Sequence, residues 1–272
     1  MRSLEANVDL TNTDIAVIDY GLSSEQLKLL KQHNVIVVKG AVGGHVVTLR
    51  FVDTANFLKN TAYEQVLFID GGDIVFQDNF SFVFEKDKDS FRVVPLDMEV
   101  MFFEAFIPKN FTPPMQKDLW RVLKRKQVLN AGVIFAPRNK FIYLCNQVKE
   151  LVREKHKYGP DQIIVNYVLY QSSLVLLNKK FNFIMGTERE GFAIKDGIFY
   201  RKNGEKIVIA HNAGHDAFLR PIHNFGYGEG HNQLKHFVYY SRRIIFILFR
   251  GFRILQHFLG LIYLFCKKRQ KK

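Results

Sequence analysis

The sequence predicts an α/β fold, in which helices cover a sheet that contains at least one βαβ unit. Residues 14–21 read DIAVIDYG, an apolar run that ends in a turn, and residues 35–40 read VIVVKG, which is rich in β-branched residues. Between them LSSEQLKLLKQHN spaces its leucines as on one face of a helix. Strand, helix and strand within about 30 residues form a βαβ unit. With 272 residues, 47% of them hydrophobic, the chain can bury one sizeable core without a second domain.

The remaining elements follow from local signals in chain order. Ser23 and Gln26 have the spacing of a capping box at the start of the first helix. Asn203-Gly204, between two strand-like runs, predicts a hairpin. The other expected elements are a helix over 51–59, a strand over 66–69, an irregular excursion over 91–120 with a helix near 115–124, a strand over 128–137, a helix over 140–156 and a helix over 159–171.

The formal charge of +13 is concentrated at the end of the chain. Residues 234–272 contain ten Lys or Arg and no Asp or Glu, so the remaining 29 basic and 26 acidic residues leave only +3. The longest uncharged run of this segment, residues 254–266, has 13 residues, whereas a membrane-spanning helix needs roughly 20. The tail therefore predicts a basic amphipathic helix lying on an anionic membrane surface.

The cysteines and the first residues bear on the compartment. Cys145 and Cys266 lie far apart, which does not indicate a disulfide framework and favours a reducing compartment. Residues 1–14 contain no apolar run typical of a secretory signal. We expect a cytoplasmic protein that associates peripherally with the cytoplasmic face of a membrane.

Residues 66–80 read VLFIDGGDIVFQDNF, so a predicted strand ends in two aspartates, Asp70 and Asp73, separated by two glycines. Ligands of α/β sheets bind at the carboxyl ends of strands, where this loop lies. Carboxylate oxygens suit Mg²⁺ and Mn²⁺, and glycine lets the backbone approach a phosphate closely. A plain turn has the same composition, so the loop alone leaves both interpretations open.

Three other motifs place polar residues at strand ends or a helix start. The strand KIVIA ends in HNAGH, where the neutral imidazole of His211 can complete a metal's ligand set; a zinc protease is not indicated, because the Glu of HExxH is missing. Asn130 interrupts the apolar strand VLNAGVIFAP and needs a partner if it is buried. Asp161 and Gln162 open a helix, where an aspartate is also a common cap. Each motif alone also fits a structural role.

In chain order the four motifs are strand-DGGD-strand, LNAG, PDQ-x3-N and HNAG. A chain with these motifs in this order resembles the nucleotide-sugar glycosyltransferases of the GT-A fold, particularly glycosyltransferase family 8 and its relatives. The resemblance extends over residues 16–222. It implies a Rossmann-like mixed sheet flanked by helices in residues 1–233. The membrane-associating tail predicted from its charge, 234–272, lies outside the resemblance. It also implies a hexosyltransferase that moves a hexose from a nucleotide-diphosphate sugar, expected to be a UDP-sugar, to a glycan or glycolipid acceptor with retention of configuration.

The resemblance further implies residue roles. Asp70, Asp73 and His211 would bind Mn²⁺ or Mg²⁺, and Asp161 and Gln162 would take part in catalysis. Donor and acceptor would be bound by Asp19, Gly71, Gly72, Asn130, Ala131, Gly132, Gly214, His215 and Arg220.

The chain departs from the family pattern at three places. The acidic motif is usually DxD and is here DGGD. Family members often carry a lysine and Pro-Trp after the glycine of HNAG, whereas His215 or Arg220 would have to contact the phosphate here. The family also has a strand before DIAVIDYGL that helps bind the base, and only thirteen residues precede Asp14.

Three other functions share features with this sequence. Sugar-phosphate nucleotidyltransferases use a similar sheet, but they usually carry a basic Gly-rich loop after the first strand, which this sequence lacks. A catalytically degenerate membrane protein that only binds a nucleotide sugar stays open. Nucleic-acid binding is disfavoured, because the basic residues lie among apolar ones in the tail.

Overall fold

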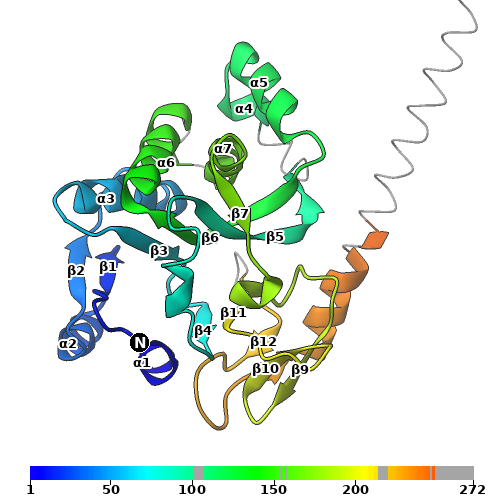
Figure 1. Ribbon diagram of the computed structural model, residues 1–272. Coiled ribbons are helices and arrows are strands. Elements are labelled where there is room, and N and C mark those ends of the chain that lie inside the picture. Colours follow the sequence, from blue (N-terminus) through cyan, green and yellow to red (C-terminus); the bar gives the residue numbers. More distant parts are fainter. Residues whose placement is uncertain (101–106, 154, 157, 214–219, 246, 249–272) are drawn as a thin grey trace, which may run out of the picture.

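The computed structural model describes residues 1–100, 107–153, 155–156, 158–213, 220–245 and 247–248 (Figure 1). Its helices are α1 (Arg2–Asn7), α2 (Ser24–Gln32), α3 (Val46–Lys59), α4 (Ile107–Asn110), α5 (Pro113–Leu123), α6 (Arg138–Leu151) and α7 (Pro160–Leu169), with 3₁₀ helices η1 (Ser81–Val83) and η3 (Lys179–Phe181). Its strands are β1 (Ala16–Asp19), β2 (Ile36–Lys39), β3 (Gln65–Ile69), β4 (Ile74–Phe76), β5 (Phe91–Glu99), β6 (Gln127–Pro137), β7 (Leu174–Leu176), β8 (Phe183–Ile184), β9 (Phe192–Lys195), β10 (Ile198–Arg201), β11 (Ile209–His211), β12 (Ile222–His223) and β13 (Gln233–Leu234).

The predicted βαβ unit is formed by β1, α2 and β2. The two strands are parallel, and the backbone N–H of Gln26 donates to the Ser23 hydroxyl at 3.2 Å. The Gln26 side chain accepts in return from the Ser23 backbone at 2.9 Å, so the predicted capping box is confirmed. Within the part of the chain that the structure describes, this pair of strands forms a sheet of its own.

The largest sheet has the order β3-β6-β5-β7 and is mixed, as predicted. β6 runs antiparallel to both β3 and β5, while β7 runs parallel to β5. Helices α3, α6 and α7 lie together above this sheet in Figure 1. Phe51 of α3, Phe68 of β3 and Phe141 of α6 are buried, with consecutive ring centroids 5.1 Å apart. This aromatic contact anchors the helices on the sheet, since burying a phenylalanine contributes about 1.5–3 kcal/mol.

A second, three-stranded sheet has the order β4-β11-β8, with β11 antiparallel to β4 and parallel to β8. The chain leaves the large sheet after Ile69 and enters the second sheet at Ile74. The four residues of the DGGD loop are therefore the connection between the two sheets.

Several predicted boundaries move. Helix α3 begins at Val46 rather than residue 51, because the His45 side chain caps it by accepting from the Val47 backbone at 3.3 Å. Helix α6 ends at Leu151, since Val152 already has an extended backbone. The excursion over 91–120 contains the nine-residue strand β5 and the start of α5.

The predicted turn at Asn203-Gly204 is present. The Gly204 backbone donates to the Arg201 carbonyl at 2.9 Å, and Tyr200 bridges to Lys206 in antiparallel fashion. A second hairpin, β9 to β10, turns at Asp196-Gly197, where both residues have positive φ (50° and 76°). Asp-Gly favours this geometry, and this second turn was not predicted.

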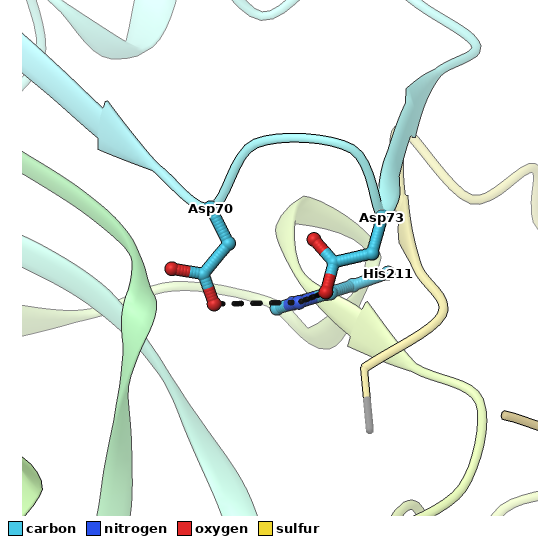
Figure 2. Close-up of side chains that lie close together, drawn as sticks. All are labelled: Asp70, Asp73 and His211. Carbon is cyan, nitrogen blue, oxygen red and sulfur yellow. Dashed lines mark ion pairs between the residues drawn. The ribbon is translucent and has the colours of Figure 1, made fainter. Parts of the chain in front are cut away.

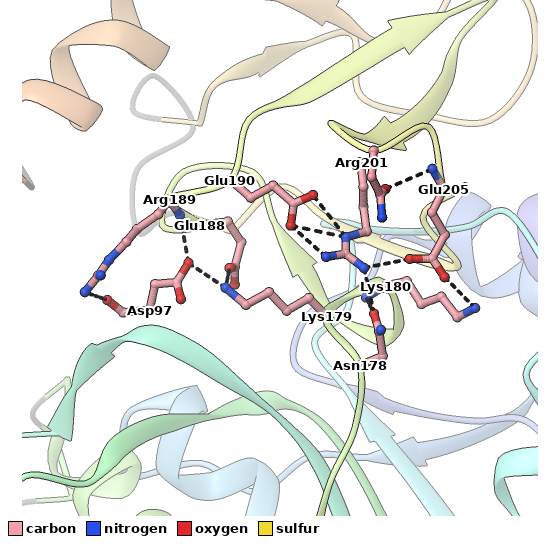
Figure 3. A network of polar contacts seen from close by, with 10 residues as sticks. Asp97, Asn178, Lys179, Lys180, Glu188, Arg189, Glu190, Arg201 and Glu205 are labelled. Carbon is pink, nitrogen blue, oxygen red and sulfur yellow. Dashed lines mark hydrogen bonds and ion pairs between the residues drawn. The ribbon is translucent and has the colours of Figure 1, made fainter.

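A polar network ties β5 to the segment that follows β8 (Figure 3). The Lys179 ammonium lies 2.5 Å from the Asp97 carboxylate and 2.6 Å from that of Glu188. The Arg189 backbone also donates to Asp97 at 2.9 Å. Burial raises the pKa of Glu188 to about 7, although Lys179 opposes the shift.

The chain after Leu234 begins with a helix over residues 236–245, called the C-terminal helix below. Tyr239 is buried with its ring 5.3 Å from that of Phe192, while Phe237, Tyr240 and Ile244 are 85%, 56% and 56% exposed. One face of the C-terminal helix thus packs on the body and the other presents apolar side chains. Residues 249–272 of the predicted tail lie outside the described residues, and no helix in the described part is long and apolar enough to cross a bilayer.

Candidate functional site

The DGGD loop places two carboxylates between the sheets. Asp70 directly follows β3 and Asp73 directly precedes β4. Gly72 has φ +87°, a left-handed backbone that glycine adopts without strain, so the chain can turn between the two aspartates. Gly71 has open space where a Cβ would lie.

The two aspartates meet His211, the last residue of β11 (Figure 2). The Nε2 atom of His211 lies 3.8 Å from Asp70 Oδ2 and 3.7 Å from Asp73 Oδ2. One ligand atom from each residue falls within 4.8 Å of the others. The structure thus brings together the three residues that the sequence analysis selected as metal ligands, from segments far apart in the chain.

A chain of hydrogen bonds orients the imidazole of His211. Its Nδ1 lies 3.0 Å from Asn182 Oδ1, and because Asn182 Nδ2 donates to Asn130 Oδ1 at 3.2 Å, the Asn182 oxygen is the acceptor. Nδ1 therefore carries the proton, and the lone pair of Nε2 faces the two carboxylates. Nε2 and Asp73 Oδ1 are buried and have no hydrogen-bond partner among the described residues.

Arg50 of α3 is a cation of the site that the sequence analysis missed. Its guanidinium donates to Asp70 Oδ1 and lies 3.9 Å from Asp161 Oδ2. It also lies 5.2 Å from the ring centroids of both Phe51 and Phe68. Burial lowers the pKa of Arg50, while Asp161 opposes the shift and favours the charged form.

The LNAG and PDQ motifs are joined by hydrogen bonds. Gln162 accepts from the Ala131 backbone at 3.1 Å and donates to the Leu129 carbonyl at 2.7 Å. Asp161 is 5% exposed, and burial raises the pKa of its carboxyl group, with Arg50 opposing. Gln162 thus holds the LNAG backbone, while the carboxylate of Asp161 faces Arg50.

Gly132 leaves the space that Asp70 occupies. A Cβ at Gly132 would lie 2.5 Å from Asp70 Oδ2, closer than side-chain contacts allow. The Gly132 carbonyl accepts from the Asp70 backbone at 2.9 Å, and the Gly132 N–H donates to Asn130 Oδ1 at 2.9 Å. A glycine is therefore needed here for a close approach rather than for a turn.

The remaining predicted residues lie at the edge of the site, away from it, or outside the described residues. Arg220 lies 3.6 Å from Asp73 Oδ2, at the edge of the site. Asp19 ends β1, and its carboxylate accepts from the backbones of Gly21 at 2.8 Å and Leu22 at 2.6 Å, so it caps its own loop. Those two hydrogen bonds lower the pKa of Asp19. Gly214 and His215 lie outside the described residues.

A cavity of about 2100 Å³ opens beside the site, larger than the roughly 300–1,000 Å³ of ordinary small-molecule pockets. Its walls include Asp70, Asp73, Asn130 and Asp161, and it continues between β1 and β3. The residues ahead of β1 form the helix α1 rather than a strand. The space is large enough for an elongated, multi-part ligand.

Fold and site together define an α/β protein with a three-residue candidate cation site where two sheets are joined. Two carboxylates and one imidazole, with unpartnered buried donor atoms on Asp73 and His211, fit a hard divalent cation. Arg50 and Arg220 add positive charge around the same carboxylates. Such a set can neutralise an anionic group of a bound ligand.

The chain matches no protein-family model and none of the curated proteins. Among solved structures it is similar to the apo structure of the bifunctional glycosyltransferase WbbM, with 17% identity and a TM-score of 0.49 over 79% of this chain and 42% of that one. It is also similar to the glycosyltransferase GlyE of Streptococcus pneumoniae TIGR4, with 14% identity and a TM-score of 0.46 over 85% of this chain and 53% of that one. The apo form of GlyE gives 14% identity and a TM-score of 0.44. The chain spans about half the length of these structures, and similarity at this level establishes neither a family nor an activity.

Proposed function

We propose that this chain is a metal-dependent GT-A glycosyltransferase, which moves a hexose from a nucleotide-diphosphate sugar, with UDP as the expected nucleotide, to a glycan or glycolipid acceptor. The observation that carries the proposal is the meeting of Asp70, Asp73 and His211 at the wall of a large cavity, with the Nε2 lone pair of His211 directed at the two aspartates. The motifs that carry the resemblance to glycosyltransferase family 8 support it, because DGGD, LNAG, PDQ and the histidine of HNAG converge on this one site.

The proposed reaction breaks the bond between the sugar's anomeric carbon and the diphosphate and forms a bond from that carbon to an acceptor hydroxyl oxygen. The hydroxyl proton leaves with the departing diphosphate. Mn²⁺ or Mg²⁺ bound by the three residues would neutralise negative charge on the diphosphate. Arg50 and Asp161, which face each other, would bind the polar hydroxyls of a sugar. Gln162 and Asn130 hold the backbone of the LNAG segment that would lie against it.

Donor hydrolysis by the purified chain tests the proposal. UDP-, GDP- and CMP-sugars are incubated with Mn²⁺ or with EDTA, and release of the free nucleotide is measured for the wild type and for Asp70→Ala. Asp78→Asn serves as a matched control, because Asp78 is an exposed aspartate just after β4. We expect metal-dependent release that Asp70→Ala abolishes and Asp78→Asn retains. If no donor is hydrolysed and calorimetry detects no donor binding, the transferase assignment fails.

We also propose that the acceptor is displayed at a membrane surface and that the protein associates with the cytoplasmic face of that membrane through residues 234–272. Phe237, Tyr240 and Ile244 follow helical spacing and are exposed together on one face of the C-terminal helix. The ten basic residues of this segment, with no acidic ones, favour anionic headgroups.

Vesicle co-sedimentation tests the membrane proposal. The wild type should bind vesicles that contain anionic lipid and be released by salt, since the attraction is partly electrostatic. The double variant Phe237→Ser, Ile244→Ser should bind less, and Leu29→Ser, Val42→Ser should bind like the wild type, because Leu29 and Val42 are exposed apolar residues elsewhere. Equal binding by both double variants would refute a role for this face.

A further inference from the structure

The C-terminal helix sends one arginine into the cavity. Arg242 lines it together with Asp70 and Asp73, and its Nη1 donates to the Ala213 carbonyl at 3.3 Å. Ala213 lies two residues beyond His211, on the segment that leaves the candidate metal site. A guanidinium of the cavity wall is thus bound to the backbone two residues beyond His211, one of the three candidate ligands.

The space for this guanidinium is made by a glycine. A Cβ at Gly186 would lie 2.5 Å from Arg242 Cζ and 2.7 and 2.8 Å from its two terminal nitrogens, so all three atoms lie against this one position. The same segment runs beside the candidate site, since the Met185 backbone donates to the His211 carbonyl at 3.1 Å. Gly186 therefore lets Arg242 reach the region next to His211.

We propose that Arg242 is a donor-binding residue, whose guanidinium binds the diphosphate of the nucleotide sugar. This inference rests on the proposed function. A guanidinium presents planar N–H groups that match two phosphate oxygens at once, and it stays charged at neutral pH. Bound beside the segment that follows His211, it would add positive charge where the leaving diphosphate gains negative charge.

Arg242 is partly buried. Burial lowers the pKa of Arg242, because a cation removed from water is less stable. Arg220 lies 3.6 Å from the Asp73 carboxylate, whereas Arg242 is bound to the Ala213 carbonyl, so the two arginines contact different residues.

A purely structural role is the competing explanation, and Arg243 provides the control. Arg243 donates to the Tyr239 hydroxyl at 2.8 Å and to the Arg189 carbonyl at 2.6 Å. It holds the same helix to the same part of the body, but it does not line the cavity. If Arg242 only anchors the helix, substituting either arginine should have a similar effect.

Calorimetry of the full-length protein separates the two roles. UDP, GDP and inorganic pyrophosphate are titrated in EDTA, so that no metal contributes, into the wild type, Arg242→Gln, Arg242→Lys and Arg243→Gln. We expect Arg242→Gln to weaken binding about 10- to 100-fold, the range for losing hydrogen bonds to a charged group. Arg242→Lys should restore part of the affinity, and Arg243→Gln should bind like the wild type.

Gly186→Ala is an independent variant. Its Cβ meets only the end of a flexible side chain, so it should displace the guanidinium while leaving the melting temperature near that of the wild type. We expect it to weaken pyrophosphate binding as Arg242→Gln does. If Gly186→Ala and Arg242→Gln bind pyrophosphate as tightly as the wild type does, the proposal is overturned.

The remaining outcomes distinguish this inference from the proposed function. Arg242-dependent binding of pyrophosphate without binding of either nucleoside diphosphate would support the role of Arg242 and count against the nucleotide-sugar donor. If Arg242→Gln and Arg243→Gln weaken nucleoside diphosphate binding equally, the role of Arg242 is overturned. The proposal that the donor is a nucleotide sugar would still hold. Absence of any binding by the wild type would overturn the role of Arg242 as well.

Discussion

Arg50 donates a hydrogen bond to Asp70, so a cation from α3 already lies against the first aspartate of the loop that joins the two sheets. The same guanidinium lies 3.9 Å from Asp161, which brings the DGGD loop and the PDQ helix to one side chain. A divalent cation at the candidate site would share Asp70 with Arg50. The positive charge of Arg50 therefore acts against metal binding, while its hydrogen bond holds the carboxylate in place.

Arg50→Met should bind Mn²⁺ more tightly than the wild type in the absence of nucleotide. Methionine keeps an unbranched apolar stem against Phe51 and Phe68 but removes a charge close to the carboxylates. We expect a gain on the order of tenfold, since removing a unit charge at such range changes the interaction by a few kcal/mol at most. Calorimetric Mn²⁺ titration measures it, with Arg138→Met of α6 as the control. Weaker Mn²⁺ binding would mean that Arg50 chiefly holds Asp70 in place.

Gly132→Ala should disturb Asp70 directly. The new Cβ would lie 2.5 Å from Asp70 Oδ2 and 2.9 Å from its Cγ, so the carboxylate must move. We expect metal affinity to fall about tenfold or more, as when the surroundings of a ligand are altered. Gly71→Ala, in the DGGD loop next to Asp70, has open space at its Cβ and should retain the wild-type affinity. Equal affinities for the two variants would show that Asp70 is not a ligand.

Asn182→Leu should disorient His211. The substitution keeps the branched shape of the side chain and removes the acceptor for Nδ1–H, so the buried imidazole loses its hydrogen bond. We expect a loss of about 1–3 kcal/mol in the free energy of unfolding and of about 10- to 100-fold in metal affinity. Asn182→Asp keeps an acceptor and should restore much of the metal affinity. NMR of the His211 ring nitrogens checks the mechanism, since the wild type should carry its proton on Nδ1.

Glu188→Gln should alter how stability depends on pH. The pKa of Glu188 is raised to about 7 in the fold from an ordinary value of 4.5. A carboxyl group whose pKa is raised in the folded state contributes its full stabilisation at pH values below its pKa in the unfolded state. That contribution is lost progressively as the pH rises from about 4.5 to about 7. The wild type should therefore lose stability relative to Glu188→Gln across that window, by on the order of 3 kcal/mol at most.

Urea unfolding at a series of pH values measures this difference. Glu190→Gln is the control, because Glu190 pairs with Arg201 in the neighbouring part of the network at 2.8 Å. A stability difference between wild type and Glu188→Gln that is constant from pH 4.5 to 7 would contradict the raised pKa.

The predictable parts of the fold are those whose signals are local. The capping box of α2 and the turn at Asn203-Gly204 depend on residues a few positions apart, and both are present. The hairpin at Asp196-Gly197 carried an equally local signal and was predictable in principle. The division into two sheets was not, because the pairing of β4 with β11 depends on residues more than a hundred positions apart.

The residues of the candidate site also divide into those that local sequence signals predict and those that only the folded structure reveals. Asp70, Asp73 and His211 stand at strand ends, where polar residues after apolar runs are visible in the sequence. Arg50 is one of several polar residues in the helical segment VVTLRFVDTANF, whereas Asn182 is the one polar residue of the apolar stretch FNFI. A lone polar residue in such a segment is a signal that a buried partner exists, but the identity of that partner depends on the folded structure.

The DGGD loop has a further consequence because it is the covalent link between the large sheet and the second sheet. Asp70 is positioned by its backbone hydrogen bond to β6, and His211 by its place in β11, so the three candidate ligands meet only when both sheets are folded and docked. Cation binding would then act as a cross-link between two halves of a cooperative unit. It should stabilise the whole chain by mass action rather than one loop, and a partly folded molecule would have no affinity for the ion.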